Sequence, residues 1–463
     1  MSSVDLRIPL GLGEKLLDHV FQTGTHECVA FGLVSHAQLR RRPTLLLRKI
    51  VVLREEDYLP TRAHGATWRG AAMFPLMGDA VDDNLGILVI HAHDHEGPPR
   101  LSGDDLASAA RLIPMFRNRV PSRPHGTVVV SRTHATGRIW LPDRTQPSDL
   151  GEVRWFGSAI TDWTPATAIS GENCSAFVRQ SLVVGGQGQG WINRAKVAVV
   201  GLGGGGSHVV QQLTYLGIGE IVAIDSDTFE ETNHHRVVGA GGKDLGRRKV
   251  DIMYRLVRQI NLHGRLRRIH ARIPNAVAVS AVRDCDIIVG CVDTLFTRSD
   301  LQELASRYLI PYVDVGVSIR PVETNNVTDR RVSISGNIVT FIPGGFCMWC
   351  SGFITDEKLK AEQQGPTRGY FEKNNDEAQV VSLNGVVSSQ AVTEVLQLLT
   401  GFGGASVRTA DTRVPGADVQ RGYKKFDGVS GTLQEWGATR RKDCNHCRET
   451  LAAGDLIFRK PSA

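Results

Sequence analysis

A glycine cluster between two apolar segments constrains the fold of this chain more than any other feature. Residues 196–200 (KVAVV) form a short apolar run typical of a buried strand. The cluster Gly201-Leu-Gly-Gly-Gly-Gly-Ser207 follows, and helix-like apolar spacing continues to Leu216. Glycines at such a junction let the backbone approach a phosphate, and the helix N-terminus attracts that anion. The sequence therefore predicts an α/β nucleotide-binding domain.

Further strands alternate with helical stretches after the cluster, as in a parallel sheet. Short apolar segments predict strands at 220–224, 286–289 and 310–315, and helical spacing predicts a core helix at 385–400. An earlier segment has its own patterning, and a stretch rich in Pro, Ser, Thr and Gly separates the two. We therefore expect a first domain at 1–145, a linker at 146–175 and the α/β domain at 176–463.

Length, charge and cysteine content exclude several classes of protein. A length of 463 residues suggests two or three domains. The net charge of +6 is too small over this length to favour nucleic-acid binding. No apolar run approaches the roughly 18 residues that would predict a membrane span, and the acidic start is not expected to be a signal peptide. The eight cysteines include two CxxC pairs, which favours metal binding in a reducing, cytoplasmic setting.

Acidic and basic residues follow the second predicted strand. Asp225 ends that strand, where an acid binds ribose hydroxyls in dinucleotide-binding folds. Such a dinucleotide-binding unit is most common in nicotinamide-dependent dehydrogenases, but a dehydrogenase needs no pair of basic residues after the second strand. A triphosphate that is cleaved does need cations, because charge develops on the departing pyrophosphate. Arg236 and Lys249 supply them, and Asp293 after a later strand can hold Mg²⁺.

These motifs together resemble the ThiF/MoeB/ubiquitin-activating-enzyme adenylation family over residues 176–447. The pattern comprises an Arg-Gln pair before the first strand, the glycine loop, a DxD…N…R…K run and a late Asp. The resemblance implies a Rossmann-like domain with a mainly parallel sheet, and a homodimer. It also implies that ATP adenylates the C-terminal carboxylate of a ubiquitin-like protein, giving an acyl-adenylate and pyrophosphate.

The same resemblance implies a role for each residue of the motifs. Arg179 would reach the triphosphate across the dimer interface, Asp225 would bind ribose, and Asn233 would help order the site. Arg236 and Lys249 would bind phosphates, and Asp293 would bind Mg²⁺. The residues expected at the nucleotide are Gly201, Gly203, Gly204, Gly206, Ser207, Asp225, Asp227, Asn233, Arg236, Lys249 and Asp293.

Two CxxC pairs, Cys347 with Cys350 and Cys444 with Cys447, can each supply two corners of a tetrahedron. Together they predict a closed Cys₄ structural zinc site, with a redox pair or two unrelated pairs as alternatives. The segment 351–385 contains no cysteine, although thioester-forming relatives place one there. We therefore expect the reaction to stop at the adenylate, which a separate thiol or sulfur carrier then attacks.

The remaining cysteines have weaker assignments. Cys285 and Cys291 flank an apolar strand and are expected to be buried packing residues. Cys174, just before the nucleotide-binding domain, is the better candidate for a free thiol.

A second possible metal site lies in the N-terminal segment. His91 and His93 follow an apolar run, and residues at i and i+2 of a strand face the same side. Asp105, entering a predicted helix, would complete three ligands and leave one position for water, as in catalytic zinc sites. Glu27 precedes an apolar strand-like stretch and can serve as the general base for that water.

This constellation resembles the JAB/JAMM (MPN) metallopeptidase family, whose signature is an early Glu, HxH and SxxD. The resemblance covers residues 4–130, implies an α+β domain, and assigns Ser102 to the oxyanion. Asp94 stands where the family usually has proline, and the gap before Ser102 is one residue longer than usual. His93 with His95 is an alternative ligand register, and an inactive relative of the family is an alternative interpretation.

The sequence therefore predicts a two-part enzyme that activates a ubiquitin-like protein and processes or deconjugates it with an N-terminal zinc hydrolase. One rival is sulfur-carrier activation in cofactor biosynthesis, with an inactive N-terminal docking domain. The others are a nicotinamide oxidoreductase and a non-catalytic scaffold. The expected partners are the ubiquitin-like protein, a conjugating enzyme or sulfur donor, and a second copy of the chain, with no nucleic acid or membrane.

Overall fold

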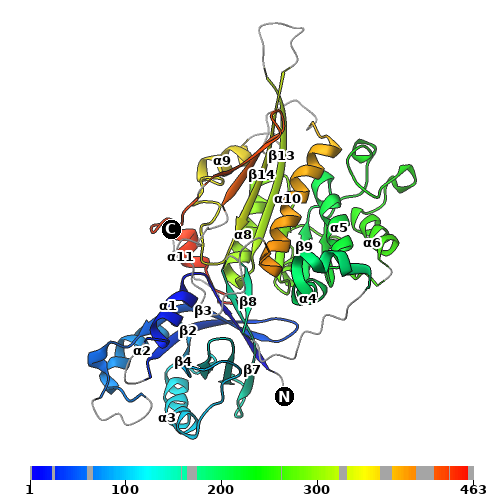
Figure 1. The fold of residues 1–463 in the computed structure, drawn as a ribbon. Coiled ribbons are helices and arrows are strands. Elements are labelled where there is room, and N and C mark those ends of the chain that lie inside the picture. The colour runs from blue at the N-terminus through cyan, green and yellow to red at the C-terminus, as the bar shows by residue number, and fades with distance from the viewer. Residues whose placement is uncertain are drawn as a thin grey trace.

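Two eight-stranded sheets divide the chain into two domains, shown in the computed structural model of Figure 1. The structure describes residues 3–22, 27–59, 66–157, 159–163, 175–261, 263–322, 331–364, 378–402, 422–436 and 438–456. No helix within these ranges is long and apolar enough to cross a membrane.

The N-terminal sheet has the order β1-β3-β2-β4-β5-β6-β7-β8, and a further pairing of β1 with β7 closes it on itself. One core contains α1 side chains, and a second core contains α2 and α3 side chains, so helices cover both faces of the sheet. The elements are β1 (Val4–Ile8), α1 (Leu12–Val20), β2 (Val29–Gln38), β3 (Pro43–Val52), α2 (Phe74–Asp82), β4 (Gly86–Ala92), α3 (Gly103–Arg119), β5 (His125–Val130), β6 (Ala135–Trp140), β7 (Ser148–Phe156) and β8 (Ile160–Asp162).

This domain extends past the boundary expected at residue 145. Strands β7 and β8 lie in the stretch 146–175, which composition alone marks as a linker. β7 pairs with both β6 and β1, and its Val153 and Phe156 are buried. The polar Asp149 and Glu152 of the same strand are more exposed than these apolar residues. The N-terminal domain therefore reaches at least residue 163.

The C-terminal sheet has the order β11-β10-β9-β12-β13-β14-β15-β16. Its first five strands are parallel, and the last three add antiparallel pairings, so the sheet is mixed rather than mainly parallel. β13 and β14 form a long hairpin that projects beyond the rest of the domain (Figure 1). The strands are β9 (Lys196–Val200), β10 (Glu220–Ile224), β11 (Leu266–Ile269), β12 (Ile287–Gly290), β13 (Tyr312–Val322), β14 (Arg331–Phe341), β15 (Tyr423–Asp427) and β16 (Thr432–Trp436).

The helices of the C-terminal domain pack around one continuous core with this sheet. The strands predicted at 196–200, 220–224, 286–289 and 310–315 and the helix predicted at 385–400 all correspond to elements of the structure. The helices are α4 (Val178–Arg194), α5 (Gly204–Leu216), α6 (Lys249–Ile260), α7 (Ala276–Val282), α8 (Leu295–Tyr308), α9 (Asp356–Gln364), α10 (Val381–Thr400) and α11 (Asn445–Thr450).

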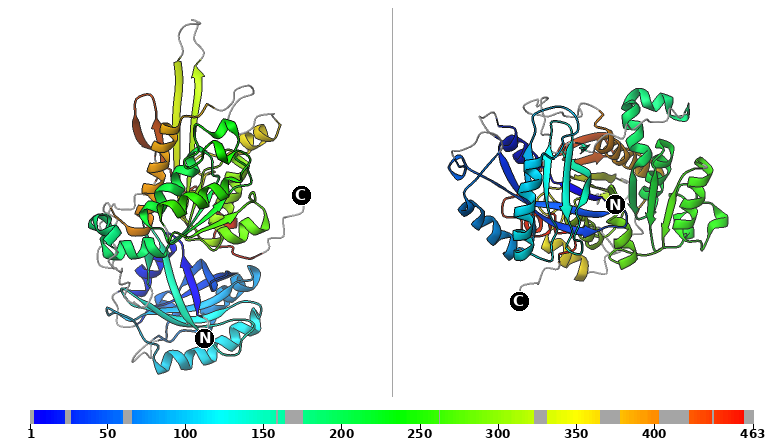
Figure 2. Two further views of the ribbon diagram at one scale, coloured as in Figure 1. Left: turned by 90° about the vertical axis from the view of Figure 1, so that its right-hand side faces the viewer. Right: turned by 90° about the horizontal axis from the view of Figure 1, so that it is seen from below.

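The two domains are stacked directly on each other (Figure 2). A buried guanidinium of β7, on Arg154, is hydrogen-bonded to Asp286, which stands just before β12. Arg7 of β1 donates to the backbone oxygen of Tyr308 at 2.7 Å. Asp455, near the end of the C-terminal domain, accepts a hydrogen bond at 2.8 Å from the backbone of Gln38 at the end of β2. Polar contacts from three elements therefore fix the domains against each other.

Candidate functional site

The glycine loop joins β9 to α5 in a turn that requires glycine at two positions. Gly201 has φ +86°, a left-handed conformation. A Cβ on Gly206 would lie 1.8 Å from the backbone oxygen of Gly201, so no side chain fits there. At Gly203, the N-cap of α5, a Cβ would meet none of the described atoms within 4 Å. The space beside Gly203, at the start of α5, is therefore open, as a phosphate site at a helix N-terminus requires.

Asp225 lies beside this loop at the carboxyl end of β10. Its carboxylate accepts hydrogen bonds from the backbone of Leu202 at 2.6 Å and of Asp227 at 2.7 Å. Burial raises the pKa of Asp225, while the charge of Lys249 and these two bonds oppose the rise. The loop and the acid that is expected to bind ribose are thus held together.

Lys249, the first residue of α6, donates to Asp227 at 3.0 Å. Burial acts to raise the pKa of Asp227, but the hydrogen bond and charge of Lys249 outweigh it and lower that pKa. The Lys249 ammonium is itself largely buried. The structure therefore brings together the expected ribose-binding acid, its neighbour and one of the two expected phosphate-binding cations.

The segment that carries Asn233 and Arg236 is held against α5. Ser207 is fully buried, and its hydroxyl accepts from the backbone of Val238 at 3.0 Å. Asn233 is also buried, and its amide oxygen accepts from the backbone of Glu230. Ser207 and Asn233 thus position this segment, whereas the Arg236 side chain is partly exposed and lies near Gly204.

Asp293 is exposed between the end of β12 and the first turn of α8. Beside it, Glu362 of α9 accepts hydrogen bonds from the backbone of Leu295 at 2.9 Å and of Phe296 at 3.0 Å. A carboxylate at this position satisfies free N–H groups and complements the helix dipole. The contact of Glu362 with the start of α8 could not be predicted from the sequence. An acidic residue on a polar helix does not indicate which other helix it will cap.

Arg179 lies on α4 and is exposed. Its neighbour Gln180 donates to the backbone oxygen of Leu216 at 3.0 Å, at the C-terminal end of α5. The glycine loop is at the opposite end of that helix, roughly 18 Å away at 1.5 Å per residue. The structure therefore does not bring Arg179 to the glycine loop of its own chain.

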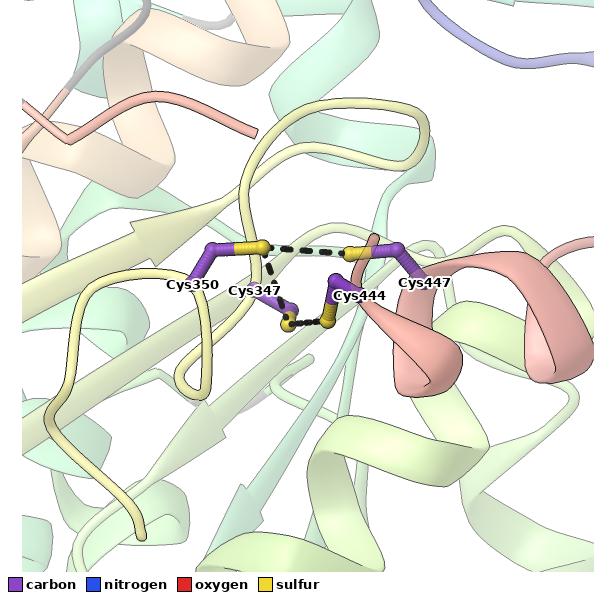
Figure 3. A group of neighbouring side chains, drawn as sticks. All are labelled: Cys347, Cys350, Cys444 and Cys447. Atoms are coloured by element: carbon purple, nitrogen blue, oxygen red, sulfur yellow. Dashed lines mark hydrogen bonds between the residues drawn. The ribbon is translucent and has the colours of Figure 1, made fainter. Parts of the chain in front are cut away.

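The two CxxC pairs come together on two separate segments, as Figure 3 shows. Three sulfur pairs are separated by 3.5–3.6 Å, and all four sulfurs lie within 4.8 Å of one another. A tetrahedral zinc–sulfur site with bonds of about 2.3 Å has sulfur–sulfur edges of about 3.8 Å. Hydrogen bonding by the neighbouring thiols, Cys447 foremost, lowers the pKa of Cys347 against the effect of burial. The cluster therefore fits a zinc ion.

The middle residues of the two CxxC motifs add a packing contact that sequence reasoning did not anticipate. Trp349 and His446 stack with ring centroids 3.9 Å apart and an interplanar angle of 15°. The contact joins the loop after β14 to α11 independently of the sulfurs.

The other described cysteines are poor nucleophiles. Burial raises the pKa of Cys28, Cys285 and Cys291, so their thiols stay protonated near neutral pH. The structure therefore confirms burial of Cys285, and Cys291 lies partly exposed behind the glycine loop. Cys174, the candidate free thiol, lies outside the described residues.

In the N-terminal domain, strand register places the predicted metal ligands side by side. His91 of β4 pairs with Val29 of β2 in an antiparallel ladder, so His93 and Glu27 lie opposite each other just beyond the paired ends. The His93 Nε2 is 4.0 Å from a Glu27 carboxylate oxygen. His91 Nε2 is 3.0 Å from an Asp105 carboxylate oxygen. The possible ligand atoms of His91, His93 and Asp105 all lie within 4.8 Å of one another.

Ser102 and Asp105 form a capping box at the start of α3. The Ser102 hydroxyl donates to the Asp105 carboxylate at 2.8 Å and accepts from its backbone at 3.1 Å. Burial acts to raise the pKa of Asp105, but the His91 contact and the bonds from Ser102 outweigh it and lower that pKa to about 2. Asp105 is therefore a carboxylate whose position is fixed by Ser102.

The two residues after His93 make their polar contacts outside this cluster. Asp94 forms an ion pair with Arg132 at 2.6 Å. His95 is exposed, and its ring contacts the backbone oxygen of Glu96 at 2.9 Å. The structure thus favours the ligand register of His91 with His93. Arg132, which fixes this loop, was missed because an isolated arginine carries no motif.

Comparison with known proteins places the C-terminal part in one family. Residues 177–447 match the ThiF family. The adenylyltransferase and sulfurtransferase MOCS3-1 of Drosophila pseudoobscura pseudoobscura is 30% identical over 301 residues, which is 64% of this chain and 58% of that protein. The SAMP-activating enzyme E1 of Haloferax volcanii is 29% identical over 167 residues, which is 36% of this chain and 57% of that protein. The adenylyltransferase and sulfurtransferase uba4 of Emericella nidulans is 33% identical over 139 residues, which is 30% of this chain and 29% of that protein.

These matches span less than two thirds of the length of each relative. Among solved structures, E. coli MccB with MccA-N7isoASN is 21% identical, with a TM-score of 0.46 over 59% of this chain and 75% of that one.

The match to the ThiF family contains the glycine loop, Asp225, Lys249 and all four clustered cysteines, and the N-terminal domain lies outside it. Because it covers more than half of the 463 residues, the chain belongs to the ThiF family.

Proposed function

We propose that this chain uses ATP to adenylate the C-terminal carboxylate of a small ubiquitin-like or sulfur-carrier protein. The observation that carries this proposal is the group at the carboxyl end of the parallel strands. It comprises the open space beside Gly203 at the start of α5, the buried Asp225 and the Lys249 ammonium. A dehydrogenase needs no such cation beside its glycine loop. Membership of the ThiF family supports the same conclusion.

The names of the relatives support the class of carrier. Two of them are adenylyltransferases and sulfurtransferases, and a third is a SAMP-activating enzyme. These names favour sulfur-carrier activation, which the sequence leaves as the rival pathway, over protein conjugation. A sulfur donor is then the expected second partner, in place of a conjugating enzyme.

In the proposed reaction, a carboxylate oxygen of the carrier bonds to the α-phosphorus of ATP. The bond from that phosphorus to its bridging oxygen breaks, and pyrophosphate leaves with the electron pair. Asp225 binds the ribose, while Arg236 and Lys249 offset the negative charge that develops on the phosphates. Asp293 would hold Mg²⁺, which supplies further charge neutralisation when bound.

A second copy of the chain completes this site. Arg179 lies at the far end of α5 from its own glycine loop, so its proposed contact with a triphosphate requires the partner's site. The same helix exposes apolar side chains, with Val178 53%, Leu182 83% and Val183 65% exposed. Such an exposed apolar stripe is typical of an interface. We therefore assign α4 to the homodimer contact.

No described cysteine outside the Cys₄ cluster offers a reactive thiolate, so we expect the reaction on this chain to stop at the adenylate. A thioester needs a reactive thiolate, and burial keeps Cys285 and Cys291 protonated. An external thiol or sulfur donor then attacks the acyl-adenylate and releases AMP.

ATP–pyrophosphate exchange tests the proposal, with full-length protein and small carriers that end in Gly-Gly. We expect exchange that requires the carrier and is lost in Asp293→Ala. A carrier that lacks its last residue is the control and supports no exchange. Tight NADH binding without any exchange would instead favour the oxidoreductase interpretation.

A zinc ion held by Cys347, Cys350, Cys444 and Cys447 is the proposed structural metal of this domain. The sulfur geometry supports it, and the four thiolates leave no position for water, as in closed structural sites. Its role is to tie the loop after β14 to α11.

A specific observation favours a second activity, hydrolysis by the N-terminal domain. His91, His93 and Asp105 offer three ligands for a catalytic zinc, with Glu27 beside them. A bound zinc would supply Lewis acidity to the scissile carbonyl. Glu27 accepts a proton from the attacking water. The Ser102 hydroxyl donates its one proton to Asp105 in this structure, so it would donate to the oxyanion only after leaving that carboxylate. The proposed substrate is a peptide or isopeptide bond next to a carrier C-terminus.

Zinc content distinguishes the two metal proposals. We expect about two zinc ions per chain. His91→Ala should lose one, Cys444→Ser the other, and Cys28→Ser neither. One ion that survives His91→Ala would mean that the N-terminal domain binds no zinc and only docks partners.

A further inference from the structure

The start of α10 packs directly over the glycine loop. Ser388 donates to the backbone oxygen of Gly205 at 3.1 Å. One turn earlier, a Cβ on Gly385 would lie 3.3 Å from the ring of His208 in α5. The two helices are thus in close contact where α5 presents its free N–H groups.

Asn384 is the polar side chain at the centre of this contact. It is 2% exposed, and its amide nitrogen has no hydrogen-bond acceptor within the described part of the chain. A Cβ on Gly204 would lie 2.3 Å from that nitrogen and 3.5 Å from Cδ of Arg236. The amide and the Arg236 side chain therefore converge on Gly204, the first residue of α5.

A buried donor without an acceptor is unusual in a folded protein, and a ligand is one of the ways in which such a group is satisfied. The surroundings of this nitrogen suit an anion. The α5 N-terminus offers further N–H groups, and Arg236 contributes a positive charge. The helix terminus and the unpartnered amide are independent observations that indicate the same ligand chemistry.

We propose that Asn384 binds the nucleotide, with its amide nitrogen donating to a phosphate oxygen of ATP held at the N-terminus of α5. This inference rests on the proposed adenylation function. It adds to the glycine loop a donor from α10, and this donor, Asn384, lies 178 residues after Gly206, the loop's last glycine. Asn384 thereby makes ATP binding depend on the packing of α10 against α5.

The test is calorimetric titration of the full chain with Mg·ATP and, separately, with adenosine. A hydrogen bond to a charged group sets the expected loss, so Asn384→Ala should bind ATP about 10- to 100-fold more weakly. Its affinity for adenosine, which has no phosphate, should not change. Asn384→Asp keeps the side-chain size but replaces the donor with a carboxylate, and should weaken ATP binding further.

Ser389→Ala is the matched control, because Ser389 is exposed on the next turn of α10 and contacts Gln212 instead of the loop. It should bind ATP as the unaltered chain does. Equal ATP affinity in folded Asn384→Asp or Asn384→Ala would overturn the inference, and so would equal losses for ATP and adenosine. If the unaltered chain binds no ATP at all, the proposed function itself fails.

Discussion

Lys249 is paired with Asp227 in this structure, and its ammonium is also a cation that the proposed reaction needs. Loss of one preorganised charge at a transition state typically costs about 10²–10³-fold in rate. Lys249→Gln keeps a polar side chain of similar length but removes the charge. We expect it to lower ATP–pyrophosphate exchange by about 10²–10³-fold, measured with a saturating carrier.

Lys243→Gln is the matched control, because Lys243 is exposed in the same segment. It should leave the exchange rate within about twofold, since solvated surface charges contribute little. An equal loss in both variants would show that net charge, and not the position of Lys249, sets the rate.

Among single residues, those that stand at the end of a strand could be placed best from the sequence. Asp225 could be placed because parallel strands end at one edge of the sheet, and His91 and His93 because i and i+2 share a face. Asn384 could not be placed, because its contact with Gly204 depends on how α10 packs against α5. That packing depends on the whole domain and leaves no local pattern.

Among the elements, α9 is held to α8 by one carboxylate. Glu362 accepts from the first two N–H groups of α8, next to Asp293. Glu362→Ala should release these groups, because no other acceptor from α9 reaches them among the described residues. Hydrogen exchange at Leu295 and Phe296 should become at least about tenfold faster, as expected for lost charge-assisted bonds.

Glu357→Ala is the comparison for that experiment, since Glu357 is an exposed acid of the same helix. Its variant should leave both amides unchanged. Unchanged exchange in Glu362→Ala would mean that α9 does not stabilise the start of α8.

Element types followed from periodicity where strands are buried on both faces, as with β9, β10 and β12. The antiparallel strands β15 and β16 were missed, because β16 is exposed throughout and shows no apolar alternation. β7 and β8 were missed for a related reason, since glycine and charged residues interrupt their apolar positions. Their pairing partners, distant in sequence, determine that they are strands.

For the whole molecule, the buried pair of Arg154 and Asp286 joins the two domains. Removing one partner of a buried ion pair leaves an unpaired charge and typically costs about 3–5 kcal/mol. Arg154→Met should lower the free energy of unfolding by about this amount, measured in urea. Arg138→Met breaks the exposed pair with Asp149 and should cost at most about 1 kcal/mol.

The same pair predicts a pH dependence of stability. Burial acts to raise the pKa of Asp286, but the charge and hydrogen bond of Arg154 outweigh it and lower that pKa. A carboxyl with a lowered folded pKa contributes stability above its unfolded value of about 3.9. This stabilisation is lost as pH falls through the pKa of Asp286 in the folded protein. The difference in unfolding free energy between the unaltered chain and Arg154→Met should therefore shrink below about pH 4. A deficit that stays constant to pH 2 would contradict the assignment.

The central claim is that a carrier carboxylate attacks the α-phosphorus of ATP in the C-terminal domain. Isotope transfer tests it most directly, with a carrier whose C-terminal carboxylate contains ¹⁸O, hydroxylamine as the acceptor, and mass spectrometry of the nucleotide product. Because the carboxylate oxygen stays on phosphorus when the acyl group leaves, the account predicts AMP that carries one ¹⁸O. Unlabelled AMP, or ADP in place of AMP, would contradict it.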